Sequence, residues 1–567
     1  MITRLNLYIS NSRYLTVIPV KQKQFLIYLL MAVPVIAFAV FIFKHALNVP
    51  FMDDMELVDS INVLKKGDTN PFTTLVRQQN DHRSTFPRLG IILSYLLSGT
   101  LDFRLTILLG YFNLILLGYA FYLVYRSANK GITLFLPVVL MLFSPLVYYV
   151  HLWSLTAFQH TLSIAFSILC LYFLQPEKKA SWLFAFPIAI AATLTNLDGI
   201  SVMPVCIFWL MTQRRWKHSL IFLVLTAVYL AIYFTDFKLS SASQIGFSVS
   251  SLPLMAHAFV VVTGSFARFI SDTHGIVLST ILGSGILITF IALKFFPRIQ
   301  DRYRFSFAEI FSLDLTEICF LRMLGSMAMI MIGRYAEGVG NMIAPRFQVY
   351  SVSVAILFYL FLVKNAPFRK AVFFKIAAIS IALVLSVYSY KKYDRAVNFS
   401  DAGLKADSYN YTRNRVFLHQ YYNLPDPDPA FYENYNFPEY FGKNVINNWK
   451  AAAASGSDLG IEVTEYGDLP RYKTYIHRVK AIRVMNVGGE VPGKDVYLGL
   501  TENANSNRFY LVALKDDRPS WKGGKSVAGE FDAEIPAKMK PGSYTATLCW
   551  LDDEKPRSVM ISKNVSL

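Results

Sequence analysis

Residues 25–43, with the sequence FLIYLLMAVPVIAFAVFIF, form an uncharged apolar run near the N-terminus. A helix rises about 1.5 Å per residue and the hydrocarbon core of a bilayer is about 30 Å thick, so this run is long enough to cross a membrane. Basic residues precede it, and neither a shorter apolar core nor a small-residue cleavage site is evident. We therefore expect a retained first span with a cytoplasmic N-terminus.

The sequence contains ten further apolar runs, and two shorter stretches that are either short spans or interfacial helices. The ten runs are 104–125, 131–150, 157–174, 182–195, 198–212, 218–235, 276–293, 316–333, 346–363 and 371–389; the two stretches are 88–99 and 252–270. The sequence thus predicts 11 good spans and a mainly α, polytopic bundle of about 11–13 transmembrane helices. If the two stretches do not cross, every basic cluster between the runs falls on the cytoplasmic side; if 88–99 crosses, the intermediate loops invert.

The distribution of charge separates the chain into two parts. Only 16% of the 567 residues are charged and 54% are hydrophobic, against about a quarter charged in average globular chains. Residues 1–390 hold 31 basic and 16 acidic side chains, whereas 391–567 hold 24 and 22. A nucleic-acid binder would carry its positive charge on a solvated domain, whereas a membrane protein carries it in cytoplasmic loops. These numbers therefore argue against a soluble enzyme and against a nucleic-acid partner.

The sequence predicts three regions. Residues 1–390 form the membrane domain, and 391–460, rich in Tyr, Asn and Pro, form a linker with short helices. Residues 461–567 contain short strand-like runs broken by Gly, Pro and Asp turns, which is typical of a small antiparallel β-sandwich. We expect this domain outside the cell or in the periplasm, on the side opposite the N-terminus.

Acidic residues of the membrane domain concentrate in one predicted outer loop, residues 45–87. Six of the 16 lie between positions 53 and 81, and a connection this long is uncommon between packed helices unless it has a function. Asp53 and Asp54 follow the first span in VPFMDD, and NDHRSTFPRL precedes the next apolar stretch. A later segment, GRYAEGVGNMIAPRFQVY at 333–350, adds two arginines before a late span.

These motifs resemble integral-membrane glycosyltransferases of the GT-C class, including bacterial aminoarabinose and mannosyl transferase-like proteins. The resemblance covers about residues 25–130 and 330–390. It implies a protein of the bacterial inner membrane that moves a sugar from a polyprenyl-phosphate donor to a glycan or lipid-linked acceptor at the outer face. Membrane lipid is then a further partner, and no cofactor is expected.

Single displacement from a sugar phosphate needs a carboxylate that deprotonates the acceptor hydroxyl, and positive charge for the leaving phosphate. Asp53 or Asp54 is the expected base, and the choice between them stays open. For the donor phosphate we expect Arg83, Arg346, His82, Arg88 and Arg334. For the sugar or the acceptor we expect Glu56, Asp81, His151, Asp198 and Glu337. We expect no metal site, although Asp53, Asp54, Asp81 and His82 could gather around a divalent ion.

Other interpretations remain open at this point. The chain could be a lipid or sugar transporter or flippase, or a noncatalytic assembly subunit that presents its C-terminal domain. Single residues also have structural explanations: Arg88 and Arg346 could reach lipid headgroups, His151 could belong to the interfacial aromatic belt, and Asp198 could lie in a tight turn between two spans.

Overall fold

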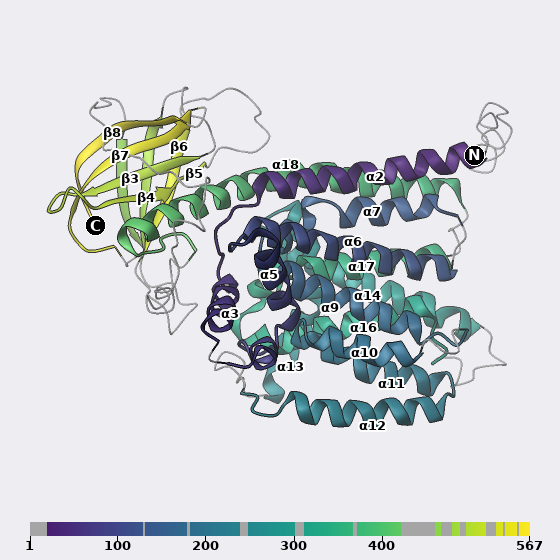
Figure 1. The fold of residues 1–567 in the computed structure, drawn as a ribbon. Coiled ribbons are helices and arrows are strands. Elements are labelled where there is room, and N and C mark those ends of the chain that lie inside the picture. Colours follow the sequence, from purple (N-terminus) through teal and green to yellow (C-terminus); the bar gives the residue numbers. More distant parts are fainter. Residues whose placement is uncertain are drawn as a thin grey trace, which may run out of the picture.

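A computed structural model gives the fold, which consists of a helical bundle followed by a domain of antiparallel β-sheets (Figure 1). The structure describes residues 20–67, 69–128, 131–177, 182–238, 248–300, 311–366, 371–420, 460–466, 479–487, 495–516, 529–536, 539–552 and 555–567. The predicted fold class, a mainly α membrane bundle with a C-terminal β domain, is confirmed.

The described part of the bundle has eight helices that are long and apolar enough to cross a membrane, or nine if a bent pair counts as one span. The α-helices are α2 Val20–His45, α3 Asp54–Lys66, α4 Pro71–Val76, α5 Thr85–Ser98, α6 Phe103–Ala128, α7 Leu136–Leu142, α8 Tyr148–His151, α9 Ser154–Phe173, α10 Trp182–Thr193, α11 Val202–Thr212, α12 Trp216–Tyr233, α13 Leu252–Thr263, α14 Gly275–Gln300, α16 Leu315–Arg334, α17 Gln348–Asn365 and α18 Val372–Asn414. Short 3₁₀ helices are η2 Thr133–Phe135, η3 Pro145–Val147, η4 Leu197–Ser201, η6 Val249–Ser251, η7 Ser265–Ile270, η8 Tyr335–Glu337, η9 Val339–Ile343 and η10 Pro345–Phe347.

The prediction of 11 good spans was too high. The run 131–150 is a bent pair, with an angle of 44° where the chain breaks before Pro145. The runs 182–195 and 198–212 form α10 and α11, of 12 and 11 residues. At about 1.5 Å per residue each covers less than 20 Å. Hydropathy measures apolar content along the chain, and it does not register the buried polar turn that separates these two helices.

The two shorter apolar stretches form short helices, α5 of 14 residues and α13 of 12 residues. At the end of α13 the chain turns through η7 and continues into α14, so α13 and α14 pack side by side. Gly264 and Gly283 make this approach possible, because a Cβ on either would collide with the backbone of the other helix. Small residues at such crossings let transmembrane helices pack closely.

Helix α18 crosses the predicted boundary between membrane domain and linker at residue 391. It runs without a break for 43 residues, and its last residues contact the β domain. About 65 Å of helix is roughly twice the hydrocarbon thickness, so the second half extends beyond the membrane. Residues 421–459 of the predicted linker lie outside the described residues.

The β domain consists of two four-stranded antiparallel sheets. The strands are β1 Gly460–Tyr466, β2 Val479–Val487, β3 Val496–Glu502, β4 Phe509–Ala513, β5 Lys515–Asp516, β6 Gly529–Pro536, β7 Ser543–Asp552 and β8 Lys555–Ser566, in the orders β1-β2-β6-β5 and β4-β3-β7-β8. One buried cluster joins Ile482 and Phe531 of the first sheet to Leu498 and Leu548 of the second. The two sheets therefore pack as a sandwich.

The two ends of the bundle differ. Helices α2 and α18 run alongside each other toward the β domain, while the start of α2 lies at the far end (Figure 1). Two ion pairs join helix ends at that far end: Lys364 of α17 binds Asp314 at 2.6 Å, and Lys294 of α14 binds Glu317 at 2.5 Å. The loop that follows α2 therefore lies at the β-domain end.

Candidate active site

Asp54 is a structural residue. Its side chain is buried; Oδ1 accepts a hydrogen bond from the Leu155 amide at 2.8 Å, and Oδ2 accepts one from the Phe51 amide at 3.1 Å. Leu155 lies in the first turn of α9, where Trp153 occupies the N-cap position without a capping side chain. The carboxylate of Asp54 thus caps α9 from another segment and lies at the positive end of its dipole.

Asp53 has the opposite environment, although it is the next residue in the chain. Its side chain is open to solvent, and no described residue makes a hydrogen bond or ion pair with it. Surrounding protein nevertheless raises the pKa of Asp53 by desolvation, against the opposing effect of Arg346 and Arg334. We call the surroundings of Asp53 the recess: the side chain is exposed, and the charges of Arg346 and Arg334 act on its carboxylate.

The two arginines come from the segment 333–350. Arg334 at the end of α16 binds Glu337 at 2.6 Å, and Asn341 donates to the other oxygen of Glu337 at 3.1 Å. Arg346 in η10 interacts electrostatically with Arg334, Glu337 and Asp53, and its Nε has no hydrogen-bond partner among the described residues. The structure thus brings together Asp53, Arg334, Arg346 and Glu337, and leaves donors of Arg346 available.

His82 lies beside this group. Its Nδ1 accepts a hydrogen bond from the Leu197 amide at 3.2 Å, so Nε2 carries the proton. Burial lowers the pKa of His82 to about 4, against the opposing charges of Asp81 and Asp198 and with a smaller contribution from Arg334. His82 is therefore neutral near pH 7, and toward a phosphate it could act as a hydrogen-bond donor through Nε2 but not as a cation.

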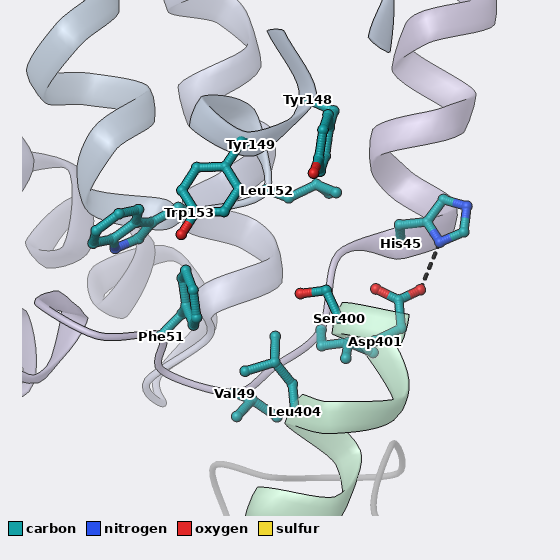
Figure 2. Close-up of a pocket in the computed structure, with 11 residues that line it drawn as sticks. His45, Val49, Phe51, Tyr148, Tyr149, Leu152, Trp153, Ser400, Asp401 and Leu404 are labelled. Atoms are coloured by element: carbon teal, nitrogen blue, oxygen red, sulfur yellow. Dashed lines mark hydrogen bonds and ion pairs between the residues drawn. The ribbon is translucent and has the colours of Figure 1, made fainter. Parts of the chain in front are cut away.

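A cleft lies between the end of α2, the segment 148–153 and α18, and Val49 and Phe51 of the loop after α2 also line it (Figure 2). It encloses about 440 Å³ of empty space, part of which is open solvent. Tyr149, Trp153 and Phe51 form an aromatic wall, and Tyr149 also interacts electrostatically with Arg346 and Asp53. The other wall comes from α18, where Asp401 binds Nδ1 of His45 at 2.6 Å. The cleft and the Asp53 recess therefore share one side chain.

Three of the expected residues lie in a polar cluster behind the recess. Glu56 pairs with Arg77, which also binds Asp59; burial raises the pKa of Glu56. Arg88 is fully buried and donates from Nη1 to the carbonyls of Leu75 and Arg77 at 3.1 and 2.7 Å. Asp81 is also buried, beside His82. Glu56 therefore joins α3, and Arg88 joins α5, to the end of α4.

Arg83 holds two segments together. Nε, Nη1 and Nη2 donate to the carbonyls of Tyr233, Val76 and Thr235 at 2.9, 2.8 and 2.8 Å, and the guanidinium lies over the Tyr233 ring. The contacts with Tyr233 and Thr235 tie the loop before α5 to the end of α12, and the contact with Val76 ties it to the end of α4. Since the three donor nitrogens are engaged by backbone carbonyls, the structure does not bring Arg83 to the arginine pair that faces Asp53.

Asp198 and His151 lie in the interior of the bundle. Oδ1 of Asp198 accepts from Ser163 and Tyr350 at 2.8 and 3.2 Å, and Oδ2 accepts from Ser326 at 2.7 Å, with Arg322 at 3.4 Å. His151 is fully buried, with its ring edge toward Phe38 of α2. Both side chains are buried among the bundle helices, so the structure does not bring them together with Asp53, Arg334 and Arg346.

Sequence reasoning missed several residues that shape this region: the His45–Asp401 pair, Gln420 and Arg322. Arg322 was detectable, since a charge inside the apolar run 316–333 requires a partner and Asp198 interrupts another run. Gln420 had no detectable signal, because its contact with Met52 joins positions 368 residues apart.

Among the described residues, no group of three or more His, Cys, Asp and Glu side chains is placed to hold a metal ion. Comparisons with protein-family models, with curated proteins and with solved structures each returned no match. The class of protein is therefore defined by the fold: an integral membrane protein with eight or nine candidate spans and a C-terminal antiparallel β-sheet domain.

The buried position of Asp54 predicts a pH-dependent stability. Desolvation raises the pKa of Asp54 to about 7 from an ordinary value of 3.8. Between these values the folded protein binds more protons than the unfolded chain, so stability decreases as pH rises from about 4 to 7, by at most about 1.4 kcal/mol per pH unit. Unfolding of the detergent-solubilised protein should show this slope, and Asp54→Asn should flatten it. An unchanged slope in Asp54→Asn would assign the pH dependence to other groups.

Proposed function

We propose that this chain is an integral-membrane glycosyltransferase that uses a polyprenyl-phosphate-linked sugar. The proposal is carried by one observation: the accessible carboxylate of Asp53 shares a recess with Arg346 and Arg334. Carboxylates suit general-base catalysis, and arginine suits the binding of phosphate oxygens. The motifs that resemble GT-C enzymes, VPFMDD and the segment 333–350, are the segments that supply these three side chains.

The reaction is a single displacement. Asp53 accepts the proton of an acceptor hydroxyl while that oxygen forms a bond to the anomeric carbon of the sugar. The bond between this carbon and the phosphate oxygen breaks, its electron pair leaves with polyprenyl phosphate, and the configuration inverts. Arg346 and Arg334 offset the charge that develops on the phosphate, and neutral His82 donates a hydrogen bond. Asp54 holds the Asp53 loop on α9. The acceptor, a glycan or a lipid-linked molecule, approaches through the cleft of Figure 2.

The proposed location follows from charge. Arg126 near the end of α6, and Arg214 and Arg215 between α11 and α12, lie at the end of the bundle away from the β domain (Figure 1). Basic residues in such connections favour the cytoplasmic side. The recess and the β domain are then on the outer face of a bacterial inner membrane, with the N-terminus in the cytoplasm.

The experiment that tests this function is sugar transfer by the purified chain in lipid nanodiscs, with a labelled polyprenyl-phosphate sugar as donor. The expected products are a labelled acceptor and free polyprenyl phosphate. Movement of the labelled lipid across sealed vesicles with no covalent change would instead identify a transporter or flippase. If the chain has neither activity, the interpretation as a noncatalytic assembly subunit is favoured.

Arg346 gives a second, quantitative prediction. Arg346→Gln should reduce kcat/KM for the donor about 10- to 100-fold, since a hydrogen bond to a charged group contributes about 1.5–3 kcal/mol. Arg346→Lys keeps the charge but loses the planar fork, so an intermediate value is expected. Arg508→Gln in the β domain is the matched control, because Arg508 pairs with Glu502 far from the recess along the chain. Equal loss in the control would contradict a phosphate-binding role for Arg346.

A further inference from the structure

The second half of α18 is polar and yet buried. Asp407, Ser408 and Asn410 are fully buried although this part of the helix extends beyond the membrane. One face of the helix, with Ala406 and Tyr409, packs on residues of β3, β4 and β7. Another face contributes to the cluster around the loop after α2. This part of the helix therefore lies between the β domain and the Asp53 loop.

The β domain is fixed to α18 by specific hydrogen bonds. Asn410 donates to the Leu511 carbonyl at 2.7 Å and accepts from the Leu511 amide at 2.8 Å, as a neighbouring strand would. Asn414 donates to the Phe509 carbonyl at 2.8 Å, and Lys405 binds Asp495 at 2.8 Å. These contacts hold β4 along the helix in one register.

Beyond α18 the chain turns back along the helix. Arg415 ends the helix with a positive φ of 56°, and the carboxylate of Asp407 then accepts three successive amides, those of Leu418, His419 and Gln420, at 2.7, 2.8 and 2.8 Å. A buried carboxylate with three backbone donors fixes the turn. We call residues 401–420, the end of α18 with this turn, the arm.

The arm ends on the backbone beside Asp53. Oε1 of Gln420 accepts a hydrogen bond from the Met52 amide at 2.9 Å. Met52 has a φ of 48°. This is a left-handed backbone conformation that residues other than glycine rarely adopt. Such a conformation persists only where surrounding contacts impose it. The Nε2 of Gln420 is buried and has no hydrogen-bond partner among the described residues, so the amide acts here through its oxygen.

We infer that the arm is a positioning device for Asp53, in which Gln420 and Asp407 are the positioning residues and the β domain holds the arm in register. Gln420 keeps Met52 in its left-handed conformation, and Asp54, through the Phe51 amide, holds the other side of the same short segment. Asp53 is thereby directed into the recess. Its role as a base rests on the proposed function, but its placement does not.

The test uses thiol labelling, which needs no enzymatic activity. The four natural cysteines are all buried, so in full-length Asp53→Cys a charged thiol reagent reports on position 53. Adding Gln420→Met removes the acceptor oxygen at nearly constant size. The labelling rate is expected to change about 3- to 10-fold, as loss of one hydrogen bond implies. Gln420→Glu keeps an acceptor oxygen and should restore the original rate. Asp407→Asn is a second variant with the same expected effect.

The control is Thr412→Ala, which removes a hydroxyl on the exposed side of α18 that bonds only to the Ser408 carbonyl within the helix. In the chain with natural Asp53, Gln420→Met should lower kcat with an unchanged donor KM. The inference is overturned if adding Gln420→Met and adding Asp407→Asn both leave the labelling rate of Asp53→Cys unchanged. Altered labelling in a chain that transfers no sugar would keep the inference and reject the proposed function.

Discussion

Asp53→Asn is expected to lower the turnover of sugar transfer by about 10²- to 10⁴-fold, the range that general-base catalysis contributes. Asparagine has nearly the same shape as aspartate but cannot accept the proton of the acceptor hydroxyl. Because no described residue bonds to the Asp53 side chain, the substitution should leave folding unchanged. The donor should still bind, since its phosphate contacts belong to Arg346 and Arg334. The measurement is kcat and donor KM in nanodiscs, with a melting curve of each variant.

The pH dependence gives a second readout of the same group. A base works in its ionised form, and desolvation raises the pKa of Asp53. Activity should therefore rise with pH through this pKa and then reach a plateau, and the rising limb should be absent from the residual activity of Asp53→Asn. Asp54→Asn is the control at the neighbouring residue. We expect it to change the stability of the protein more than the turnover of sugar transfer. Normal turnover in Asp53→Asn would exclude Asp53 as the base.

The sequence could predict the helices because each apolar run has the length and composition of a span. It predicted a turn between 182–195 and 198–212, but not that this turn is buried and that the helices on either side are short, because burial depends on which groups meet in three dimensions. Similarly, α18 continues through residue 391 because its polar face is buried by the β domain. The amino-acid composition changes from apolar to polar at residue 391, but the backbone remains helical.

At the candidate site, the sequence predicts that the loop with Asp53 and Asp54 and the segment 333–350 act together, but it could not tell the two aspartates apart. Asp53 and Asp54 are identical in type and adjacent, and only the contact of Asp54 with the Leu155 amide distinguishes them. Arg83 was expected at the phosphate because it lies in NDHRSTFPRL, directly before an apolar stretch, and because arginine suits phosphate binding. Its partners are backbone carbonyls of Tyr233 and Thr235, and a carbonyl has no signature in a sequence.

Breaking the buried pair of Asp198 and Arg322 should have the largest effect on stability. Asp198→Asn keeps the volume and leaves the guanidinium of Arg322 buried without a counter-charge. Loss of one member of a buried pair costs about 3–5 kcal/mol. The matched control is Lys392→Gln, which removes an exposed ion pair with Asp272 and should cost less than about 1 kcal/mol. Unfolding in detergent by heat or denaturant measures both.

The double variant Asp198→Asn with Arg322→Met decides what the pair contributes. It removes both charges, so it should be more stable than Asp198→Asn alone even though it carries one substitution more. If it is less stable, the hydrogen bonds that Arg322 donates to Ser326 and to the Asp198 carbonyl contribute more than the removal of its unpaired charge gains. Either result bears on the recess, because the Leu197 amide beside Asp198 donates to His82. If a variant displaces the turn that contains Leu197 and Asp198, donor binding should therefore also weaken. If the turn stays in place, donor KM should be unchanged.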